Sequence, residues 1–438
     1  MEKRAIPSEY ISELKAKTDI VEVIGNDTPL TRRGGKLFGL CPFHSEKTPS
    51  FSVSPEKQMF HCFGCGKSGD VIDFIMEREH LPYVDAVRML AERAKLPIPD
   101  VNTNDPTYRK RETMLQINRD AARFFCEQLK RPEGKEAAEY LSRRGISSET
   151  AERFRVGAAP DSWTALIEWM GKKGYAEQQL DDAGLARRTE NTGRHGYDVF
   201  RNRLMFPIAN VRGDIIGFSG RALREGGPKY LNTGGTAVFQ KGRNLFALDF
   251  AKQAKADRLI LVEGVMDVVA LHQAGFRESV ASLGTALTPE QAGLISRYAK
   301  NVILAYDSDE AGQQAVKRAV PILRNAGISV KVLEITDTKD PDDYFRANGA
   351  EAFADLLLQS KPYEEYALDR MKRKYDLTSI EGRLGYFSEA TGIICSLGNA
   401  VAREIYAAYA AKVIGVSEDT AKVEIERVCQ EKNAVSKK

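Results

Sequence analysis

Four short apolar segments alternate with helical stretches between residues 258 and 335. The segments have the length of β-strands and are apolar throughout, and they read RLILVEG (258–264), SVASLG (279–284), NVILAYD (301–307) and SVKVLEI (329–335). Strands that are apolar on both faces are typical of a parallel sheet covered by helices on both sides. The pattern therefore predicts a parallel α/β unit in this part of the chain.

The segments on either side have other patterns. Residues 108–185 place apolar side chains at i, i+3 and i+4 spacing, which predicts helices. Residues 199–220 contain short β-branched and aromatic runs around a predicted hairpin turn at Arg212-Gly213-Asp214. Residues 361–430 contain no strand candidate and read as a last helical region.

Composition narrows the class of protein. The 438 residues are 42% hydrophobic and 29% charged, which fits a folded chain of several domains. The N-terminus has no apolar signal segment, and no run of about 18 apolar residues could span a membrane. Three of six cysteines lie in one short segment and the others are scattered, unlike a secreted disulfide framework. We expect a cytoplasmic protein.

The cysteine-rich segment has the spacing of a metal site. Cys41-Pro-Phe-His44 is followed by Cys62-Phe-Gly-Cys65, and each pair can place two ligands on one tight turn. A Cys₃His set is typical of closed, tetrahedral, structural zinc sites. His61 is an alternative ligand with a poorer spacing. Phenylalanines and basic residues surround the segment and could stack on single-stranded bases, although most of these rings are expected to form the small core.

Acidic residues gather at the ends of the predicted parallel strands. Glu263 ends the first strand, Asp307 and Asp309 follow the third, and Asp340 and Asp342 follow the fourth. Asp267 lies at the start of the first helix of this unit. Because ligands bind at the carboxyl ends of such strands, we expect an oxygen-only site for Mg²⁺ or Mn²⁺. The alternative is that these acids only cap helix N-termini.

Charge is distributed unevenly around this acidic unit. Residues 108–255 carry 27 Lys and Arg against 18 Asp and Glu, a net charge of +9, whereas residues 256–345 carry 9 against 13, a net charge of −4. A basic block beside an acidic block suits an enzyme that binds a polyanion and divalent cations. The basic block includes loops marked by glycine or proline at Arg221 and Lys229, which could approach phosphates closely.

Taken in order, these motifs resemble DnaG-type bacterial DNA primases. CPFHSEKTPSFSV and HCFGCGKSGDVIDFI resemble the CHC2 zinc-binding domain of that family. RNRLMFPI, GFSGRAL and PKYLNT resemble its RNA-polymerase basic motifs, and VEGVMDVVAL, SLGTALT, YDSDEAG and DPDDY resemble its TOPRIM (topoisomerase–primase) motifs. The resemblance covers about residues 5–430. It implies metal-dependent synthesis of short RNA primers from NTPs on single-stranded DNA.

The resemblance also implies roles for individual residues. Cys41, His44, Cys62 and Cys65 would bind one structural zinc ion. Glu263, Asp307 and Asp309 would be catalytic, and together with Asp267, Asp340 and Asp342 they would hold Mg²⁺ or Mn²⁺. Contacts to template or nucleotide would come from Arg144, Arg201, Arg203, Arg221, Lys229, Tyr230, Asn232 and Lys241. Of these, Arg144 is carried over from only a short Arg-Arg-Gly stretch.

The expected architecture is a multidomain α/β protein with five segments. These are a zinc ribbon at 1–100, a Pro- and Asn-rich linker at 101–110, a mixed α/β basic subdomain at 111–255, a parallel-sheet TOPRIM subdomain at 256–345 and a helical bundle at 346–438. Family members usually continue into a domain that binds the replicative helicase. The chain ends at Lys438, so we expect this domain to be absent. The expected partners of a monomer are single-stranded DNA, NTPs and the nascent RNA primer.

Two other classes of function remain as alternatives. Another TOPRIM enzyme, such as a topoisomerase or an OLD-like nuclease, would share the acidic motifs. A topoisomerase would need a nucleophilic tyrosine on a separate domain, and a nuclease would not explain the basic loops. A non-enzymatic zinc-ribbon protein that binds DNA would keep its function after the carboxylates are neutralised.

Overall fold

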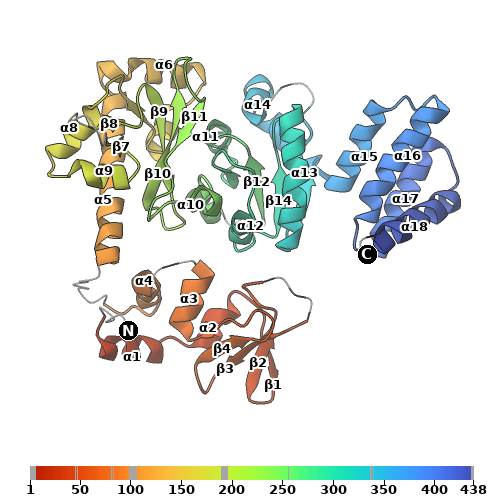
Figure 1. Ribbon diagram of the computed structural model, residues 1–438, viewed down its shortest axis with the longest axis horizontal. Coiled ribbons are helices and arrows are strands. Elements are labelled where there is room, and N and C mark those ends of the chain that lie inside the picture. Colours follow the sequence, from red (N-terminus) through yellow and green to blue (C-terminus); the bar gives the residue numbers. More distant parts are fainter. Residues whose placement is uncertain are drawn as a thin grey trace.

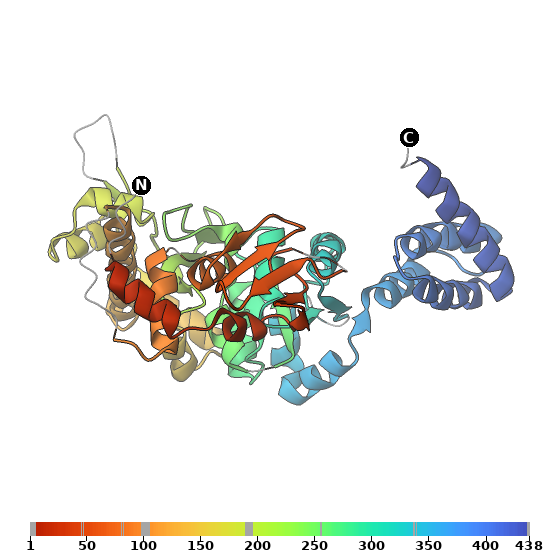
Figure 2. The ribbon, with the colours of Figure 1, turned by 90° about the horizontal axis from the view of Figure 1, so that it is seen from below.

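The computed structural model describes residues 6–435, except residues 45, 47, 80, 82, 98–105, 189–195, 255, 336–337 and 339. Figure 1 shows a central α/β body with a small β-rich unit below it and a group of helices to its right. Figure 2 shows the same parts from below, again with the C-terminal helices set apart. This arrangement confirms the predicted multidomain α/β fold.

The N-terminal unit is an antiparallel sheet flanked by helices, and its strands are paired in chain order. Its elements are α1 (Ser8–Ala16), α2 (Ile20–Gly25), β1 (Thr31–Arg33), β2 (Lys36–Gly39), β3 (Phe51–Ser54), β4 (Met59–Cys62), β5 (Ser68–Gly69), α3 (Val71–Glu79) and α4 (Tyr83–Arg93). The buried rings of Phe51, Phe60 and Phe74 pack on one another and on Phe43. Most phenylalanines near the cysteines therefore form the core, whereas Phe63 is 66% exposed.

The second unit packs a long helix, α5 (Pro106–Leu129), against an antiparallel sheet. The strand order of this sheet is β11 (Tyr230–Asn232), β10 (Ile215–Ala222), β9 (Arg203–Ala209), β6 (Gly157–Ala159). Its strands β9 and β10 pair as the predicted hairpin, and Gly213 in the turn has a φ of 89°, a conformation that favours glycine. Of the predicted linker at 101–110, residues 101–105 lie outside the described residues. Residues 106–110 begin α5, where Pro106 suits the first turn of a helix.

The elements of this second unit follow one another along residues 106–254. They are α5 (Pro106–Leu129), η1 (Pro132–Gly134), α6 (Lys135–Arg143), α7 (Ser148–Arg153), β6 (Gly157–Ala159), α8 (Ala165–Gly171), α9 (Glu177–Asp182), β7 (Ala186–Arg187), β8 (Tyr197–Asp198), β9 (Arg203–Ala209), β10 (Ile215–Ala222), β11 (Tyr230–Asn232), η2 (Lys241–Arg243), α10 (Leu248–Ala251) and η3 (Lys252–Ala254).

The third unit contains the predicted parallel sheet. Its strand order is β13-β12-β14-β15-β16, and only the edge strand β16 is antiparallel to its neighbour. The elements are β12 (Arg258–Val262), α11 (Val265–Gln273), β13 (Ser279–Ala281), α12 (Pro289–Ile295), β14 (Asn301–Leu304), α13 (Glu310–Asn325), β15 (Ser329–Val332), α14 (Pro341–Leu358) and β16 (Lys361–Pro362). One buried cluster runs from Met114 to Leu357, so the second and third units share a core.

The C-terminal unit consists of four helices, as the strand-free pattern predicts. They are α15 (Tyr363–Lys374), α16 (Ile380–Cys395), α17 (Ala400–Ile414) and α18 (Glu418–Val435). Leu368, Tyr386 and Ala410 are fully buried in their common core. A disulfide between Cys395 and Cys429 joins α16 to α18, with the two Cα atoms 5.2 Å apart.

The N-terminal unit contacts the shared core through charged side chains. The carboxylate of Asp85, which is 2% exposed on α4, lies 3.3 Å from the Arg212 guanidinium and 3.8 Å from that of Arg111. Arg297 and Glu79 form a further ion pair at 3.8 Å. Within the described ranges, no helix has the length and apolar character needed to cross a membrane.

Candidate active site and metal centre

Cys41, His44, Cys62 and Cys65 converge on one point, with their ligand atoms all within 4.8 Å of one another. The Sγ atoms of Cys41 and Cys65 are 3.8 Å apart, and Cys62 Sγ lies 3.8 Å from His44 Nδ1. Zn–S bonds of about 2.3 Å in a tetrahedral site place two sulfurs about 3.8 Å apart. The donor set and its spacing therefore fit one closed zinc site.

Short turns bring these ligands together. Cys41 and His44 follow β2, and Cys62 ends β4 one turn before Cys65. The backbone N–H groups of Phe43 and Cys65 each lie 3.4 Å from a ligand sulfur, on Cys41 and Cys62 respectively. Burial raises the pKa of the Cys41 thiol, so loss of its proton is coupled to the binding of a cation.

The alternative ligand His61 lies outside this cluster. It sits on β4 between the buried residues Phe60 and Cys62, and its own side chain is exposed. Its ring centroid is 4.5 Å from that of the exposed Phe63. Side chains alternate between the two faces of a strand, so His61 points away from the face that carries Cys62.

Glu46 holds the zinc ligands from behind, and sequence reasoning missed it. Its Oε2 lies 3.3 Å from His44 Nε2, the ring nitrogen that faces away from the sulfurs. Its Oε1 accepts hydrogen bonds from the backbone N–H groups of Cys41, at 2.8 Å, and Ser50, at 3.0 Å. The Ser50 hydroxyl also donates to Oε2. A carboxylate behind a ligating histidine fixes its ring and tautomer.

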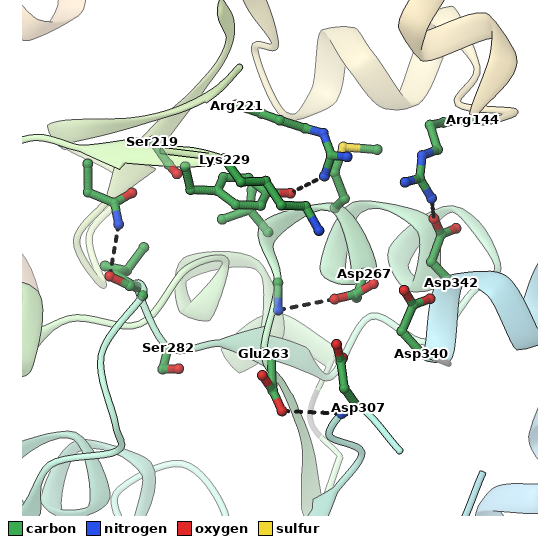
Figure 3. Close-up of a pocket in the computed structure, with 17 residues that line it drawn as sticks. Arg144, Ser219, Arg221, Lys229, Glu263, Asp267, Ser282, Asp307, Asp340 and Asp342 are labelled. Carbon is green, nitrogen blue, oxygen red and sulfur yellow. Dashed lines mark hydrogen bonds and ion pairs between the residues drawn. The ribbon is translucent and has the colours of Figure 1, made fainter. Parts of the chain in front are cut away.

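A second site lies at the carboxyl ends of the parallel strands, below the sheet of the second unit. Figure 3 shows its acids on one side and Arg144, Arg221 and Lys229 on the other. The pocket is lined by Arg144, Ser219, Arg221, Lys229, Tyr230, Asn232, Glu263, Gly264, Val265, Met266, Asp267, Ser282, Leu283, Gly284, Asp307, Asp340 and Asp342. The fold thus brings five of the six predicted acids and five of the eight predicted basic or polar residues to one pocket.

Each acid is positioned by the start of a helix or by the end of a strand. Glu263 follows β12, and its Oε1 accepts from the Asp307 backbone N–H at 3.2 Å, which ties the ends of β12 and β14 together. Asp267 accepts from the Gly264 N–H at 3.1 Å in the first turn of α11. Asp340 caps α14 by accepting from the Asp343 N–H at 2.8 Å.

The sixth acid, Asp309, is not among the residues that line the pocket. It is the N-cap of α13, and its carboxylate accepts from the Gly312 N–H at 3.0 Å. For this residue the capping role considered from the sequence is observed. Asp307, two positions earlier, does line the pocket.

The acids destabilise one another's charged forms. Burial, and then the charges of Asp340, Asp307 and Asp342, raise the pKa of Asp267 well above its usual range. Burial also raises the pKa of Asp342, against the opposing effect of Arg346 and Arg144. Close carboxylates in a buried site ionise together only when cations neutralise them. The all-oxygen donor set and its repulsion therefore fit hard divalent cations such as Mg²⁺.

Three predicted contact residues lie outside the pocket. The buried Arg203 donates to the carbonyls of Gly220, at 2.9 Å, and Pro228, at 3.0 Å, so it holds the ends of neighbouring loops. Lys241 belongs to the short helix η2, and its carbonyl accepts from Gln291 at 3.1 Å.

The third of these residues, Arg201, belongs to a separate surface cluster. Its guanidinium carbon lies 4.1 Å from the ring centroid of Trp163 and 5.3 Å from that of Tyr197. Trp163 is 65% exposed, which is unusual for so large an apolar side chain. Trp163 had no motif around it in the sequence, so only its exposure beside Arg201 draws attention to it.

Ser219 and Ser282 also line the pocket without having been predicted. Ser219 is directly opposite Asn232 in the β10–β11 pairing. The Ser219 hydroxyl and the Asn232 Oδ1 are buried and have no hydrogen-bond partner among the described residues. The Asn232 amide donates to the Leu283 carbonyl at 2.9 Å. A lone serine in a strand carries no sequence signal of such a position.

Comparisons with known families agree with the order of these units. The family described as "CHC2 zinc finger" matches residues 6–106, and "DNA primase catalytic core, N-terminal domain" matches 124–252. "Toprim-like" matches residues 260–345. The family described as "DnaB-helicase binding domain of primase" matches residues 364–419, which include α15 to α17.

The expectation that a helicase-binding domain is absent was therefore wrong. We expected this domain to follow the last helices, whereas the match lies within them. Helical periodicity alone does not distinguish a partner-binding bundle from a purely structural one. The expected absence of a helicase partner is corrected with it.

Relatives and solved structures point to one activity. The DNA primase of Clostridium acetobutylicum is 41% identical over 411 residues, which are 93% of this chain and 68% of that protein. The DNA primase of Escherichia coli K12 is 40% identical over 387 residues, 86% of this chain and 66% of that protein.

The fold is similar to a crystal structure of the zinc-binding and RNA polymerase domains of the Aquifex aeolicus primase. The TM-score is 0.59 at 34% identity, with 94% of this chain and 98% of that chain covered. A DnaG primase catalytic domain bound to single-stranded DNA matches with a TM-score of 0.60 at 34% identity, over 72% of this chain and 99% of that chain. The chain belongs to the DnaG family of DNA primases, which are DNA-directed RNA polymerases.

Proposed function

We propose that primer synthesis takes place in the pocket between the parallel-sheet acids and the basic side chains of the second unit. The observation that carries this assignment is the convergence of Glu263, Asp267, Asp307, Asp340 and Asp342 opposite Arg144, Arg221 and Lys229. Nucleotidyl transfer needs both halves, because a triphosphate binds to cations and arginines while carboxylates hold those cations.

Each group has a separate task in this proposal. Glu263 and Asp307, tied at the ends of β12 and β14, hold the cations closest to the reacting phosphate. Bound Mg²⁺ or Mn²⁺ would activate a 3′-hydroxyl and stabilise the charge on the transferred phosphoryl group. Arg221 and Lys229 hold the triphosphate of the incoming NTP from the opposite wall, and Tyr230 and Asn232 contact its nucleoside part.

The test is a priming assay on single-stranded DNA with NTPs and either Mg²⁺ or Mn²⁺. Glu263→Gln and Asp307→Asn are expected to abolish synthesis while leaving DNA affinity unchanged within about twofold, because removing a carboxylate removes no cationic contact to phosphate. Glu290→Gln, an exposed acid in the same unit, is the matched control and keeps activity. Robust synthesis by Glu263→Gln would refute the assigned site.

We infer that the template approaches along Trp163 and Arg201. An exposed indole with a guanidinium on its face offers a stacking surface and a phosphate contact together, which is how single strands are bound without sequence preference. Trp163→Ala is expected to weaken DNA binding about fivefold or more. Leu358→Ala, at an apolar residue that is 76% exposed, serves as the control. Equal affinities of the two variants would contradict this path.

We propose that the zinc ion is structural and that its unit contributes to the start of synthesis. The exposed Phe63 beside the zinc ligands is the side chain best placed to stack on a template base. Phe63→Ala is expected to reduce initiation on bare template more than extension of a preformed primer. An equal loss in both assays would show that the zinc unit only supports the fold.

We further propose that the unit of α15 to α18 binds the replicative helicase at a bacterial replication fork in the cytoplasm. The match of residues 364–419 to a helicase-binding family supports this partner. Ile405 and Val401 are exposed on α17, although they are apolar. Ile405→Glu is expected to weaken helicase binding in a titration with the purified helicase, without loss of primer synthesis. Unchanged binding would exclude this face.

A further inference from the structure

Tyr140, on α6, contacts two arginines that line the active-site pocket, although the tyrosine is not itself a lining residue. Arg144 lies one helical turn away, and Arg221 reaches it from β10. This tyrosine belongs to none of the motifs that the chain shares with the primase family. Its position behind both arginines suggests a task distinct from binding substrate.

The hydroxyl of Tyr140 orients Arg144. It accepts a hydrogen bond from Arg144 Nε at 3.0 Å. With Nε held in this way, Nη1 of the same guanidinium reaches the Asp342 carboxylate at 2.8 Å. Asp342 is 1% exposed, so this ion pair is protected from water. Arg144 is thus fixed at both ends, between a neutral hydroxyl and one of the pocket acids.

The ring of Tyr140 orients Arg221. The guanidinium carbon of Arg221 lies 4.9 Å from the Tyr140 ring centroid and 5.4 Å from that of Tyr230. Arg221 also donates from Nη1 to the Tyr230 hydroxyl at 2.9 Å. Its buried Nε has no hydrogen-bond partner among the described residues. Two aromatic neighbours therefore hold the plane of the guanidinium and leave donors for an anionic ligand.

One aromatic residue can serve two cations in a way that a charged residue could not. The face of an aromatic ring attracts a guanidinium, and a phenol oxygen accepts a hydrogen bond without carrying a charge that would compete with phosphate. Arginine side chains lose rotational freedom when they bind, and a preformed geometry reduces that loss. Tyr140 thereby holds the guanidinium groups of Arg144 and Arg221 close together, where both can bind a triphosphate.

We propose that Tyr140 is a positioning residue that sets Arg144 through its hydroxyl and Arg221 through its ring for binding the triphosphate of the NTP. This inference rests on the function proposed above for the pocket. The hydroxyl bonds to Arg144 alone, whereas the ring lies 4.9 Å from the Arg221 guanidinium carbon and 5.7 Å from that of Arg144, so two substitutions can distinguish the hydroxyl from the ring. Tyr140→Phe removes only the hydroxyl contact to Arg144. Tyr140→Leu removes both the hydroxyl and the ring.

The experiment is steady-state primer synthesis on a saturating single-stranded template with the NTP concentration varied. Tyr140→Phe is expected to raise the KM for NTP about 2- to 10-fold, as expected for loss of one hydrogen bond. Tyr140→Leu is expected to raise the KM about threefold further, because Arg221 and Arg144 then also lose their contacts to the ring. The affinity for single-stranded DNA should stay within about twofold of wild type in both variants.

Two controls separate positioning from a general effect on folding. Tyr386→Phe removes the buried hydroxyl of a tyrosine in the C-terminal helices, which has no partner among the described residues, and it should leave the KM unchanged. A double-mutant cycle gives the more direct test. In an Arg144→Met background the Tyr140→Phe substitution should have no further effect on KM, because its partner is gone.

The outcomes are decisive in both directions. A wild-type KM for Tyr140→Leu, or additive effects of Tyr140→Phe and Arg144→Met, would overturn the proposal. A parallel loss of NTP and DNA affinity with a lowered melting temperature would also overturn it, because that pattern indicates a structural role. If Glu263→Gln is inactive and the Tyr140 variants give one of these contrary results, only the proposed role of Tyr140 is refuted. If Glu263→Gln remains active, the proposal that primer synthesis takes place in this pocket is itself refuted.

Discussion

Replacing Glu46 by glutamine should weaken zinc binding without removing any zinc ligand. The substitution keeps the shape of the side chain, and its amide oxygen can take the place of Oε1, which accepts from the backbone N–H groups of Cys41 and Ser50. The amide nitrogen then replaces Oε2. It presents N–H groups to His44 Nε2, which must itself carry a proton when Nδ1 binds the metal.

The expected loss follows from this list of contacts. Two backbone hydrogen bonds survive, the Ser50 hydroxyl can rotate, and one charge-assisted contact to His44 becomes a repulsion between donors. Hydrogen bonds to charged groups contribute about 1.5–3 kcal/mol. The Kd for zinc should therefore rise about 10- to 100-fold, the range found when a carboxylate behind a ligating histidine is removed.

The assay is competition for zinc with a chromophoric chelator at pH 7.5, together with thermal melting at a fixed chelator concentration. Glu56→Gln is the matched control, because Glu56 is an exposed residue of the same unit and the change of charge is identical. A Glu46→Gln variant with the same zinc affinity as Glu56→Gln would show that the contact between Glu46 and His44 does not support the site.

Two further predictions concern the shared core. Gly312→Ala should lower primer synthesis by up to about 100-fold, because a Cβ at Gly312 would lie 2.1 Å from the Asp307 carbonyl oxygen and 2.9 Å from Glu263 Oε1. The control Gly293→Ala should keep its activity, because a Cβ there would meet nothing within 4 Å. Equal activities of the two variants would contradict the prediction. Burial lowers the pKa of His272 from 6.5 to about 4. The neutral histidine therefore contributes about 3 kcal/mol to the free energy of unfolding above pH 6.5, and this contribution is lost as the pH falls towards 4. In denaturant titrations, the loss of stability between pH 7.5 and pH 5 should be smaller for His272→Gln than for wild type. Equal losses would refute this role of His272.

Local sequence patterns were sufficient where a feature depends on neighbours in the chain. The strand and helix alternation after residue 258 predicted the parallel sheet, because strands buried on both faces must be apolar throughout. The paired spacing of Cys41 with His44 and of Cys62 with Cys65 predicted a four-ligand cluster, and these ligand atoms do lie within 4.8 Å of one another. In each pair, a single turn sets the distance between the ligands.

The same patterns could not rank residues within a motif. Arg201 and Arg203 are two positions apart, yet one stacks on an exposed tryptophan and the other donates to two backbone carbonyls. Asp307 lines the pocket while Asp309 caps a helix. A residue's task depends on where the strand ends and which direction the side chain takes there, and both are decided by packing.

The helicase-binding assignment shows a different limit. Residues 364–419 form helices that bury side chains in a common core, and burial of that kind reports only that the helices pack together. A docking surface made of scattered apolar side chains has no fixed spacing, so the sequence pattern did not distinguish it from a structural bundle. The comparison with a family was needed to correct the prediction.

The chain's own pattern was enough to predict the parallel sheet and the spacing within each Cys/His pair, because each of these patterns depends on neighbours within a few residues. Only the tertiary structure decided that Tyr140 lies behind Arg144 and Arg221, that Ser219 faces Asn232, and that Glu46 supports His44. Two of these four contacts join separate elements, and all of them depend on register and side-chain direction. Packing of the whole core sets these quantities, and spacing along the chain does not encode them.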